Sequence, residues 1–418
     1  MLVERYGFLG GMGTAAGVTN FCGLHANVYG NVRQVVRGIA DDLLARIDRL
    51  GGLNAPHSLF GGKIKAQAYD NAAYKIAADD LVLSSGAKLL FHAHAAGVVM
   101  RSERAIDALL VETKSGRRAI VASIYVDCSG DGDLCAWAGA PYEKGDVAGV
   151  MLYPSTMFRI NGVDPVKAGN AWDTFGALFA EAERRGRRFP RKAPIIRPQK
   201  NNVEWRANVT QLANPDGSPI DGTDALQLSY GEIEGRRQIV DVFRFLREAA
   251  PGFANAYILE IAPQVGIRET RRIIGDYQLT ASDVLECASF DDTIGVNGWP
   301  IEAHVAGDVV FEWPDIPNVR GFNHLPYRML LPLSVDNLLV AGRCASMTHK
   351  GQSAARVSGA CFVMGHAAGT AADLALRSDR LCREVDINQL QQRLIDDGAF
   401  LGEDALVAES RIAAKEAS

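Results

Sequence analysis

The sequence predicts an α/β fold in which one domain is assembled from both ends of the chain and an α+β domain is inserted between them. Short strands and amphipathic helices alternate near the N-terminus, and a buried strand followed by a long helix comes near the C-terminus. The middle differs, because its loops are rich in Pro, Asn and charged residues. The expected division is 1–141 with 329–385, an inserted domain over 142–328, and a C-terminal helix and tail over 386–418.

The composition is that of a soluble globular protein, with 48% hydrophobic and 22% charged residues among 418. A net charge of -5 provides no basic surface for phosphates, so nucleic acid is not an expected partner. The seven cysteines are scattered without a CxxC pair, which indicates reduced thiols in the cytoplasm and no metal site. Val357–Leu376 is long enough to span a membrane, but His366 and Asp373 favour a buried helix, so no membrane partner is expected.

The N-terminal elements follow from apolar spacing. Met1–Glu4 has the character of the end of a strand. Apolar residues at steps of three and four predict a long helix over Val32–Ile47, closed by two glycines. A second helix is predicted over Gln67–Leu83, followed by a strand at Lys88–Phe91.

The next segment changes to a period of two. Short β-like runs separated by turns predict an antiparallel meander over Gly97–Ile124. A final strand, Ser123–Asp127, enters the glycine-bearing turn Cys128–Asp133, and a helix carrying Leu134 and Trp137 is expected after it.

The middle and the C-terminal part contain fewer, longer elements. Loops are expected at Phe189–Glu204 and Ala213–Thr223, then a helix over Asp224–Ala250 and a strand at Tyr257–Ile261. The C-terminal part is predicted to contain a buried strand at Leu338–Ala341, a long helix beginning between Ser353 and Val357, and an amphipathic helix at Ile387–Ile395.

Several segments have the order and spacing of a known set of motifs. These are Glu4–Thr14 (ERYGFLGGMGT), Asp127–Asp133 (DCSGDGD), Asn337–Arg343 (NLLVAGR) with Gly365–Ala372 (GHAAGTAA), and Gly266–Gly275 (GIRETRRIIG). Together they resemble the FAD-dependent oxidoreductases related to the fumarate reductase group, over nearly the whole chain. The resemblance implies a three-layer, Rossmann-like FAD-binding domain with an antiparallel meander, FAD as cofactor, and a substrate domain between the two ends.

The resemblance also implies which residues contact FAD. A carboxylate at the end of the second strand accepts hydrogen bonds from the ribose diol, and the glycines after it allow close approach to the flavin ring. The start of the long helix is expected to direct free N–H groups at the flavin N1 and O2 edge. The residues implied are Glu4, Arg5, Gly10, Gly11, Met12, Gly13, Thr14, Gly130, Asp131, Gly342, Arg343, Ala355 and Arg356.

One motif of the family is not found in the expected place. Gly11–Ala16 fits G-x-G-x-x-A, but the charged Glu4 and Arg5 stand where an uninterrupted buried strand should precede a pyrophosphate loop. A first strand, glycine loop and helix are therefore expected before Met1. Without them, weakened FAD binding is expected.

Arg268, His304 and Tyr327 are the candidate catalytic residues. Arg268, with Arg271 and Arg272, could bind a substrate carboxylate through its rigid guanidinium fork. An ion-pair network with Glu269 and Asp276 explains the same three arginines equally well. His304 and Tyr327 suit acid–base roles by residue type, although a satisfied core residue is the ordinary alternative for each.

The expected function is hydride transfer between a small organic substrate, which could carry a carboxylate, and flavin N5. A flavin monooxygenase is the alternative within enzymes. A non-catalytic remnant or binding module with weakened FAD binding is the alternative outside them. A homo-oligomer is compatible with the sequence, which contains no signal for or against one.

Overall fold

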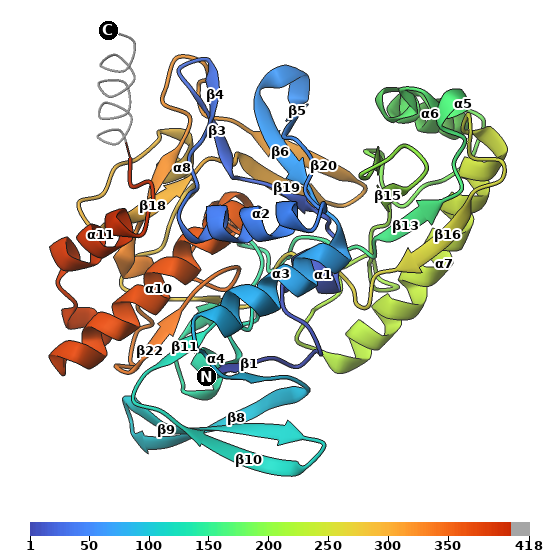
Figure 1. Ribbon diagram of the computed structural model, residues 1–418. Helices are drawn as coiled ribbons and strands as arrows, with labels where there is room; N and C mark the ends of the chain where they lie inside the picture. The colour runs from blue at the N-terminus through green and yellow to red at the C-terminus, as the bar shows by residue number, and fades with distance from the viewer. Residues whose placement is uncertain (403–418) are drawn as a thin grey trace, which may run out of the picture.

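The protein is seen in a computed structural model, in which residues 1–402 are described, and it is an α/β protein (Figure 1). Two pairs of parallel strands lie in its central part. β1 (Leu2–Val3) pairs with β7 (Leu89–Leu90), and β11 (Tyr125–Asp127) pairs with β22 (Leu338–Val340). The second pair joins segments from the two ends of the chain, as the sequence predicts.

One large core contains residues from both ends of the chain. It includes Phe21 and Leu44 from the N-terminal part, and Leu339 and Met364 from the C-terminal part. The two ends of the chain therefore contribute to one core. They do not form one hydrogen-bonded sheet, however, because the β1–β7 pair, the β11–β22 pair and the meander are separate sheets among the described residues.

The prediction of one long helix over 32–47 is wrong for the first half of that range. Residues 25–34 form the hairpin of β3 (His25–Val28) and β4 (Asn31–Gln34), and the helix α2 covers only Ile39–Arg49. The β-branched valines in this stretch favour strand geometry. Gly38, with φ of 67°, then turns the chain into the helix.

The meander is confirmed. β8 (Ala93–Ser102), β9 (Ala105–Thr113) and β10 (Gly116–Val121) are antiparallel neighbours, at the bottom of Figure 1. β11 follows, and its last residue, Asp127, accepts hydrogen bonds from the backbone of Ser129 (3.0 Å) and Cys135 (3.0 Å). The buried carboxylate thus fixes the glycine turn that leads into α4 (Asp133–Trp137).

The inserted part has a sheet and a core of its own. The antiparallel order is β14 (Ile195–Pro198), β15 (Trp205–Asn208), β13 (Phe158–Asn161) and β16 (Tyr257–Ile261), so one strand lies within an expected loop. This sheet occupies the right of Figure 1 beside α7. Aromatic side chains fill its core, including Phe158, Phe175, Trp205 and Phe253. Its helices are α5 (Pro165–Ala168), α6 (Ala171–Arg184) and the expected α7 (Ala225–Ala249).

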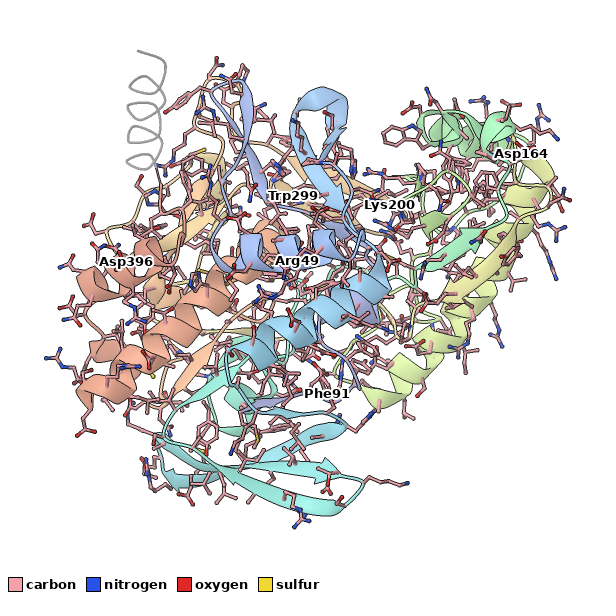
Figure 2. The ribbon with its side chains drawn as sticks, in the orientation of Figure 1. Arg49, Phe91, Asp164, Lys200, Trp299 and Asp396 are labelled. Carbon is pink, nitrogen blue, oxygen red and sulfur yellow. The ribbon has the colours of Figure 1, made fainter. Side chains whose placement is uncertain are left out.

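The domain boundary expected at residue 328 does not coincide with the boundary between the two hydrophobic cores. Leu279, Ile294, Phe322 and Tyr327 belong to the large core and not to the core of the inserted sheet. The separate core is built from residues between Phe158 and Ala256. Figure 2 shows side chains filling the junction, where Lys200 donates to the carbonyl of Leu53 (3.0 Å).

The C-terminal helical stretch is broken near its start. α9 (His349–Ala355) and α10 (Ser358–Ser378) are separated at Arg356, and α10 packs in the large core through its alanines. α11 is at Ile387–Asp396. Among residues 1–402, no helix has the length and apolarity that crossing a membrane requires.

Shorter elements complete the description. The N-terminal ones are α1 (Met12–Ala15), β2 (Asn20–Phe21), β5 (His57–Leu59), η1 (Phe60–Gly62), β6 (Ile64–Ala68) and α3 (Asn71–Ser84). The later ones are β12 (Tyr142–Glu143), β17 (Arg272–Ile273), α8 (Ala281–Leu285), β18 (Thr293–Asn297), β19 (Ile301–Val305), β20 (Asp308–Glu312), β21 (Asn323–Pro326), η2 (Tyr327–Leu330) and η3 (Cys382–Glu384).

Candidate functional site

The glycine loop before α1 is a tight turn. Gly10 and Gly11 have φ of 110° and 52°, and the Thr14 hydroxyl donates to the carbonyl of Leu9 (2.7 Å). A Cβ on Gly10 would lie 2.7 Å from the Thr14 Oγ1, whereas one on Gly11 would meet nothing within 4 Å. Gly10 is thus required by packing, and Gly11 leaves open space beside the loop.

The residues on either side of this loop bond within the protein. The Glu4 carboxylate accepts from the backbone of Tyr6 (3.0 Å), and the Arg5 guanidinium donates to the side chain of Gln264 (3.0 Å). The Gln264 backbone donates to Ala15 (3.1 Å), and its side chain to the Met12 sulfur (3.6 Å). Gln264 therefore connects the loop to the segment that leads to Arg268.

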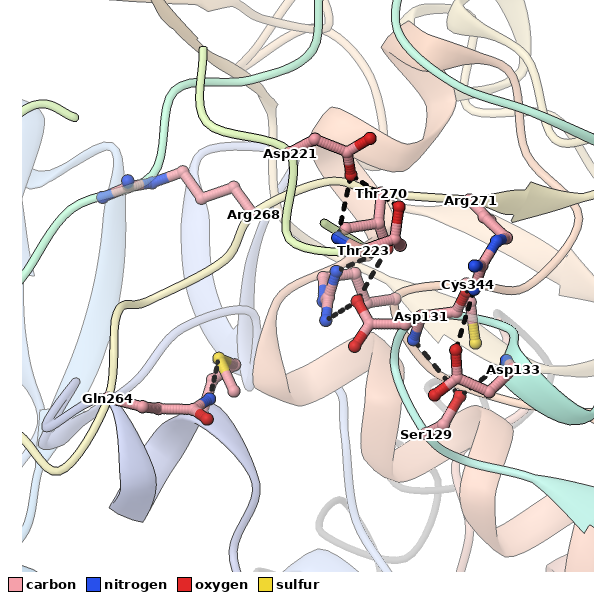
Figure 3. A network of polar contacts seen from close by, with 12 residues as sticks. Ser129, Asp131, Asp133, Asp221, Thr223, Gln264, Arg268, Thr270, Arg271 and Cys344 are labelled. Atoms are coloured by element: carbon pink, nitrogen blue, oxygen red, sulfur yellow. Dashed lines mark hydrogen bonds and ion pairs between the residues drawn. The ribbon is translucent and has the colours of Figure 1, made fainter. Parts of the chain in front are cut away.

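Asp131 and Arg343 come together, although they are far apart in the sequence. An Arg343 Nη2 donates to Asp131 Oδ1 at 2.9 Å, and the Thr270 hydroxyl donates to the same oxygen at 2.7 Å (Figure 3). A Cβ on Gly130 would lie 2.9 Å from the Arg343 Nη2, while Gly342, with φ of 88°, begins the turn that presents Arg343. The structure thus assembles the two glycine-bearing motifs into one polar cluster.

Gln352 on α9 links this cluster to Arg268. Its amide nitrogen donates to the carbonyl of Arg268 (2.8 Å) and to that of Arg343 (3.4 Å), and its side chain is fully buried. The sequence analysis missed Gln352. The sequence prediction began the buried helix at Ser353 or later, so Gln352 fell in the polar loop before it and gave no signal.

Arg268 and His304 are joined by a continuous set of hydrogen bonds. An Arg268 Nη1 donates to the carbonyl of Tyr153 (2.7 Å), and the Tyr153 backbone N–H donates to the carbonyl of His304 (3.0 Å). Arg268 also donates to the Ser155 hydroxyl (2.8 Å), and Figure 3 shows it pointing away from Asp131. Two of the three candidate catalytic residues therefore lie in one place.

Glu302 completes this group, and it is a second residue that the sequence analysis did not assign. Its Oε1 lies 2.9 Å from the His304 Nε2, and its Oε2 accepts from the indole N–H of Trp299 (2.8 Å). Arg356, at the end of α9, donates to the main-chain carbonyl of Glu302 (3.1 Å), and Ala355 before it is buried. The β19 strand thus carries Glu302 and His304 toward the end of α9.

The environment fixes the protonation of this pair. Burial, with the positive charge of Arg268, holds the pKa of His304 well below its ordinary value. Burial alone would raise the pKa of Glu302, but the hydrogen bonds from His304 and Trp299 and the charge of Arg356 outweigh it and lower the pKa. An ionised carboxylate only accepts, so the neutral His304 has its proton on Nε2 and a lone pair on Nδ1.

Tyr327 is placed differently from the other candidates. Its side chain is 1% exposed, its hydroxyl donates to the carbonyl of Cys382 (2.7 Å), and burial raises its pKa. These contacts hold η2 to η3 within the large core. The ordinary alternative of a satisfied core tyrosine therefore describes its contacts better than a catalytic role does.

Arg271 and Arg272 belong to an ion-pair network. Arg271 pairs with Asp133 (2.8 Å), and the buried Arg272 pairs with the buried Glu269. Asp276 was expected in this network but pairs instead with Arg383 (2.9 Å). These contacts support an ion-pair network, and not the binding of a substrate carboxylate, as the explanation for Arg271 and Arg272.

One N–H group at the beginning of α10 is already bonded within the protein. The Gly359 N–H donates to the carbonyl of Cys22 (2.9 Å), and the Ser358 hydroxyl accepts from the Cys22 N–H (3.1 Å). A Cβ on Gly23 would lie 2.7 Å from the side chain of Val357, so the segment after the glycine loop lies directly against this helix. At least one N–H of the first turn is therefore occupied by the protein itself.

Buried polar atoms along this region lack partners among the described residues. Among them are the oxygens Thr19 Oγ1, Asn20 Oδ1, Asn71 Oδ1 and Gln352 Oε1, and the N–H donors Arg206 Nε and Arg356 Nε. Buried polar groups in proteins nearly always have a hydrogen-bond partner, which can be the protein, a water molecule or a ligand. An isoalloxazine ring offers both donors and acceptors along its edge, so the residues present fit a flavin between the glycine loop and α9.

We expect the stability of the protein to fall in mild acid. Burial lowers the pKa of His25 and of His57 from 6.5 to about 4. Because both are depressed, their contribution is fully present above pH 6.5 and is lost as the pH falls toward about 4. Urea unfolding in steps between these pH values measures it, and replacing His25 with Gln should flatten the dependence. A free energy of unfolding that stays constant over this range would contradict the prediction.

Comparisons with known proteins show the family of the chain. No curated protein sequence matches the chain. Solved structures include PyrE3, a Diels-Alderase of pyrroindomycin biosynthesis, which is 11% identical over 99% of this chain and 70% of its own, with a TM-score of 0.41. BexE, of BE-7585A biosynthesis, is 13% identical over 99% of this chain and 67% of its own, with a TM-score of 0.43.

A third solved structure is similar to this chain at the same low sequence identity and TM-score. A geranylgeranyl bacteriochlorophyll reductase-like protein from Thermoplasma acidophilum is 12% identical over 95% of this chain and 76% of its own, with a TM-score of 0.40. These scores are too low to transfer any activity. The sequence profile described as FAD dependent oxidoreductase, in contrast, matches residues 1–394. The chain therefore belongs to the FAD-dependent oxidoreductases, and its cofactor is FAD.

Proposed function

We propose that this oxidoreductase transfers a hydride between a small organic substrate and its flavin, with His304 as the acid–base group. The observation that carries the proposal is the buried contact between Glu302 and His304. It leaves a neutral imidazole with its lone pair on Nδ1, near buried polar atoms that have no partner among residues 1–402. Bound FAD would supply the hydride acceptor or donor at N5.

The residues around His304 would orient and protect it. Glu302 fixes the tautomer, as carboxylates do for other catalytic histidines. Arg268 would act through Tyr153, holding the β19 backbone at His304, and is therefore proposed as a positioning residue. Burial of the pair excludes water, so His304 would accept a proton from a substrate hydroxyl or C–H group, or return one in the reverse direction.

We propose that the cofactor is held by both ends of the chain. Glu4 would accept from the ribose diol, and the backbone of Gly11 would approach the flavin ring where the loop leaves open space. The Asp131–Arg343 cluster and Gln352 would keep the two glycine turns together. The charge-assisted bonds in that cluster support the rigidity that close approach to a planar ring requires.

The test is anaerobic reduction of the FAD-loaded protein. A panel of hydroxy acids, amino acids and alcohols is mixed with the oxidised enzyme, and the flavin absorbance is followed in a stopped-flow instrument. Bleaching with a saturable rate supports hydride transfer. If no substrate reduces the flavin, but a reduced enzyme exposed to oxygen gives a hydroxylated product, the enzyme is a monooxygenase. A protein that retains no FAD would support the binding-module alternative.

A further inference from the structure

One face of the inserted sheet carries a row of arginines. The strand register places Arg197 of β14 opposite Arg206 of β15, and Arg206 opposite Arg159 of β13. Directly opposed residues in a sheet point to the same face, and like charges in these positions destabilise it. The row therefore needs negative charge nearby.

Within residues 1–402, carboxylates pair with the row at one end only. Arg159 pairs with Glu204 (2.6 Å) and Glu260 (3.0 Å). Arg197 instead lies 2.6 Å from the His57 Nε2, and burial and the charge of Arg197 lower the pKa of that histidine to about 4. His57 is neutral at physiological pH, and a histidine side chain would not be negative in its protonated state either, so the charge of Arg197 is not balanced by it.

Arg206, in the middle of the row, is the least satisfied. It is 5% exposed, it forms no ion pair with any carboxylate in residues 1–402, and its Nε lacks a hydrogen-bond partner there. Burial, and then the charge of Arg197, lower its pKa to about 10, so it stays protonated near neutral pH. A buried guanidinium of this kind is costly unless something pairs with it.

More cations lie next to the row. Arg191 donates to the side chain of Asn208 (3.2 Å), which also accepts from the Ser155 hydroxyl that Arg268 binds. Arg356, which donates from an Nη2 to the Glu302 carbonyl, has an Nε without a partner in residues 1–402. None of these three forms an ion pair with a carboxylate of the described chain, so the negative charge of Glu302 faces an excess of arginines.

The excess charge lies beside the proposed flavin region. Burial and the charge of Glu302 raise the pKa of the Cys22 thiol, and Arg197, Arg206 and Arg356 all lie near enough to oppose that rise. The backbone of Cys22 in turn bonds to the first residues of α10. The row on the inserted sheet thus meets the end of α9 at the segment that follows the glycine loop.

We propose that Arg206, together with Arg197 and Arg356, binds an oxyanion group of the substrate, a carboxylate or a phosphate, across the junction of the inserted sheet and the large core. The planar fork of Arg206 suits either group, because both accept two parallel hydrogen bonds. This inference rests on the proposed function only in calling the ligand the substrate. In it, the anion-binding role that the sequence suggested for Arg268 belongs to Arg206, since the fork of Arg268 is already bonded internally.

The test measures anion binding and does not depend on turnover. The FAD-loaded protein is titrated calorimetrically with malonate and with inorganic phosphate, at an ionic strength held constant with chloride. The variant is Arg206→Gln, and the matched control is Arg236→Gln, on the exposed face of α7 in the same part of the chain. We expect Arg206→Gln to raise the Kd of the bound anion about tenfold or more, and Arg236→Gln to leave it unchanged.

A second measurement separates loss of binding from loss of folding. Removing an uncompensated buried charge should leave the anion-free variant at least as stable to urea as the wild type. If Arg206→Gln does not fold, Arg206→Lys retains the charge without the fork and should bind the anion more weakly than the wild type. Binding of malonate alone identifies a carboxylate, and binding of phosphate identifies a phosphate group.

Two results would overturn the inference. One is a wild-type protein that binds neither anion, and the other is an Arg206→Gln variant that binds as the wild type does. Anion binding in a protein whose flavin no substrate reduces would count against the proposed function, while this site would stand.

Discussion

Replacing His304 with Gln is expected to slow flavin reduction by about 10²- to 10⁴-fold, the usual contribution of a positioned acid–base group. The glutamine amide can still donate to Glu302, so the fold and the FAD content should be retained. Stopped-flow reduction under substrate saturation measures the rate. Replacing the exposed His94 with Gln removes the same functional group elsewhere and should change nothing.

The pH profile distinguishes a proton-transfer role from a structural one. Because the pKa of His304 lies well below its ordinary value of 6.5, the wild-type rate should persist as the pH falls below 6.5. The slower flavin reduction that remains in His304→Gln should no longer change with pH in the range where His304 titrates in the wild type. If both histidine variants reduce flavin at the wild-type rate, His304 is a core residue and the proposed mechanism is wrong.

Replacing Glu269 with Ala is expected to lower the free energy of unfolding by about 3–5 kcal/mol, as breaking a buried ion pair does. The Glu269 side chain is fully buried and pairs with Arg272, which is 2% exposed. It also accepts from the backbone of Gly145 (3.2 Å) and Leu152 (2.8 Å), and lies 2.9 Å from the His349 Nδ1. The variant leaves all of these donors without their acceptor.

Urea unfolding measures this loss, and two further variants control it. Glu181 pairs with Arg184 and Arg185 on the surface, so Glu181→Ala should leave the free energy of unfolding nearly unchanged. Removing Arg272 as well, in Glu269→Ala with Arg272→Met, should restore much of the lost stability, since no buried charge remains unpaired. A double variant as unstable as the single one would show that the charge is not the cause.

The sequence predicts helices and strands well where the apolar residues keep one spacing, helical or strand-like, throughout a segment. The meander, the helix α7 and the strand β16 depend on long or uniform patterns, and the structure confirms them. The prediction for Val32 to Ile47 is partly wrong because the positions of Val32 and Val35 fit both a helix and a hairpin. The hairpin forms because Val35 and Val36 donate their N–H groups to Leu24, a contact that spacing alone does not reveal.

The site is only partly predictable, for a similar reason. Asp131 and Arg343 belong to recognisable motifs, so their meeting could be expected from the resemblance. Arg206 and Gln352 stand in no motif, and their importance comes from burial without matching partners. Whether a charge has a partner depends on the tertiary structure, and a single sequence gives no direct sign of it.

The pairing of β11 with β22 has a consequence for how the chain is made. The central strand pair cannot form until the ribosome has passed Val340, whereas the inserted sheet closes with residues that end near Ile261. Because domains fold as units during synthesis, the inserted part can be complete while the first third of the chain still waits for its partner. The N-terminal residues of the large core, such as Phe21 and Leu44, can therefore gain their contacts with Leu339 and Met364 only after the C-terminal part has been made.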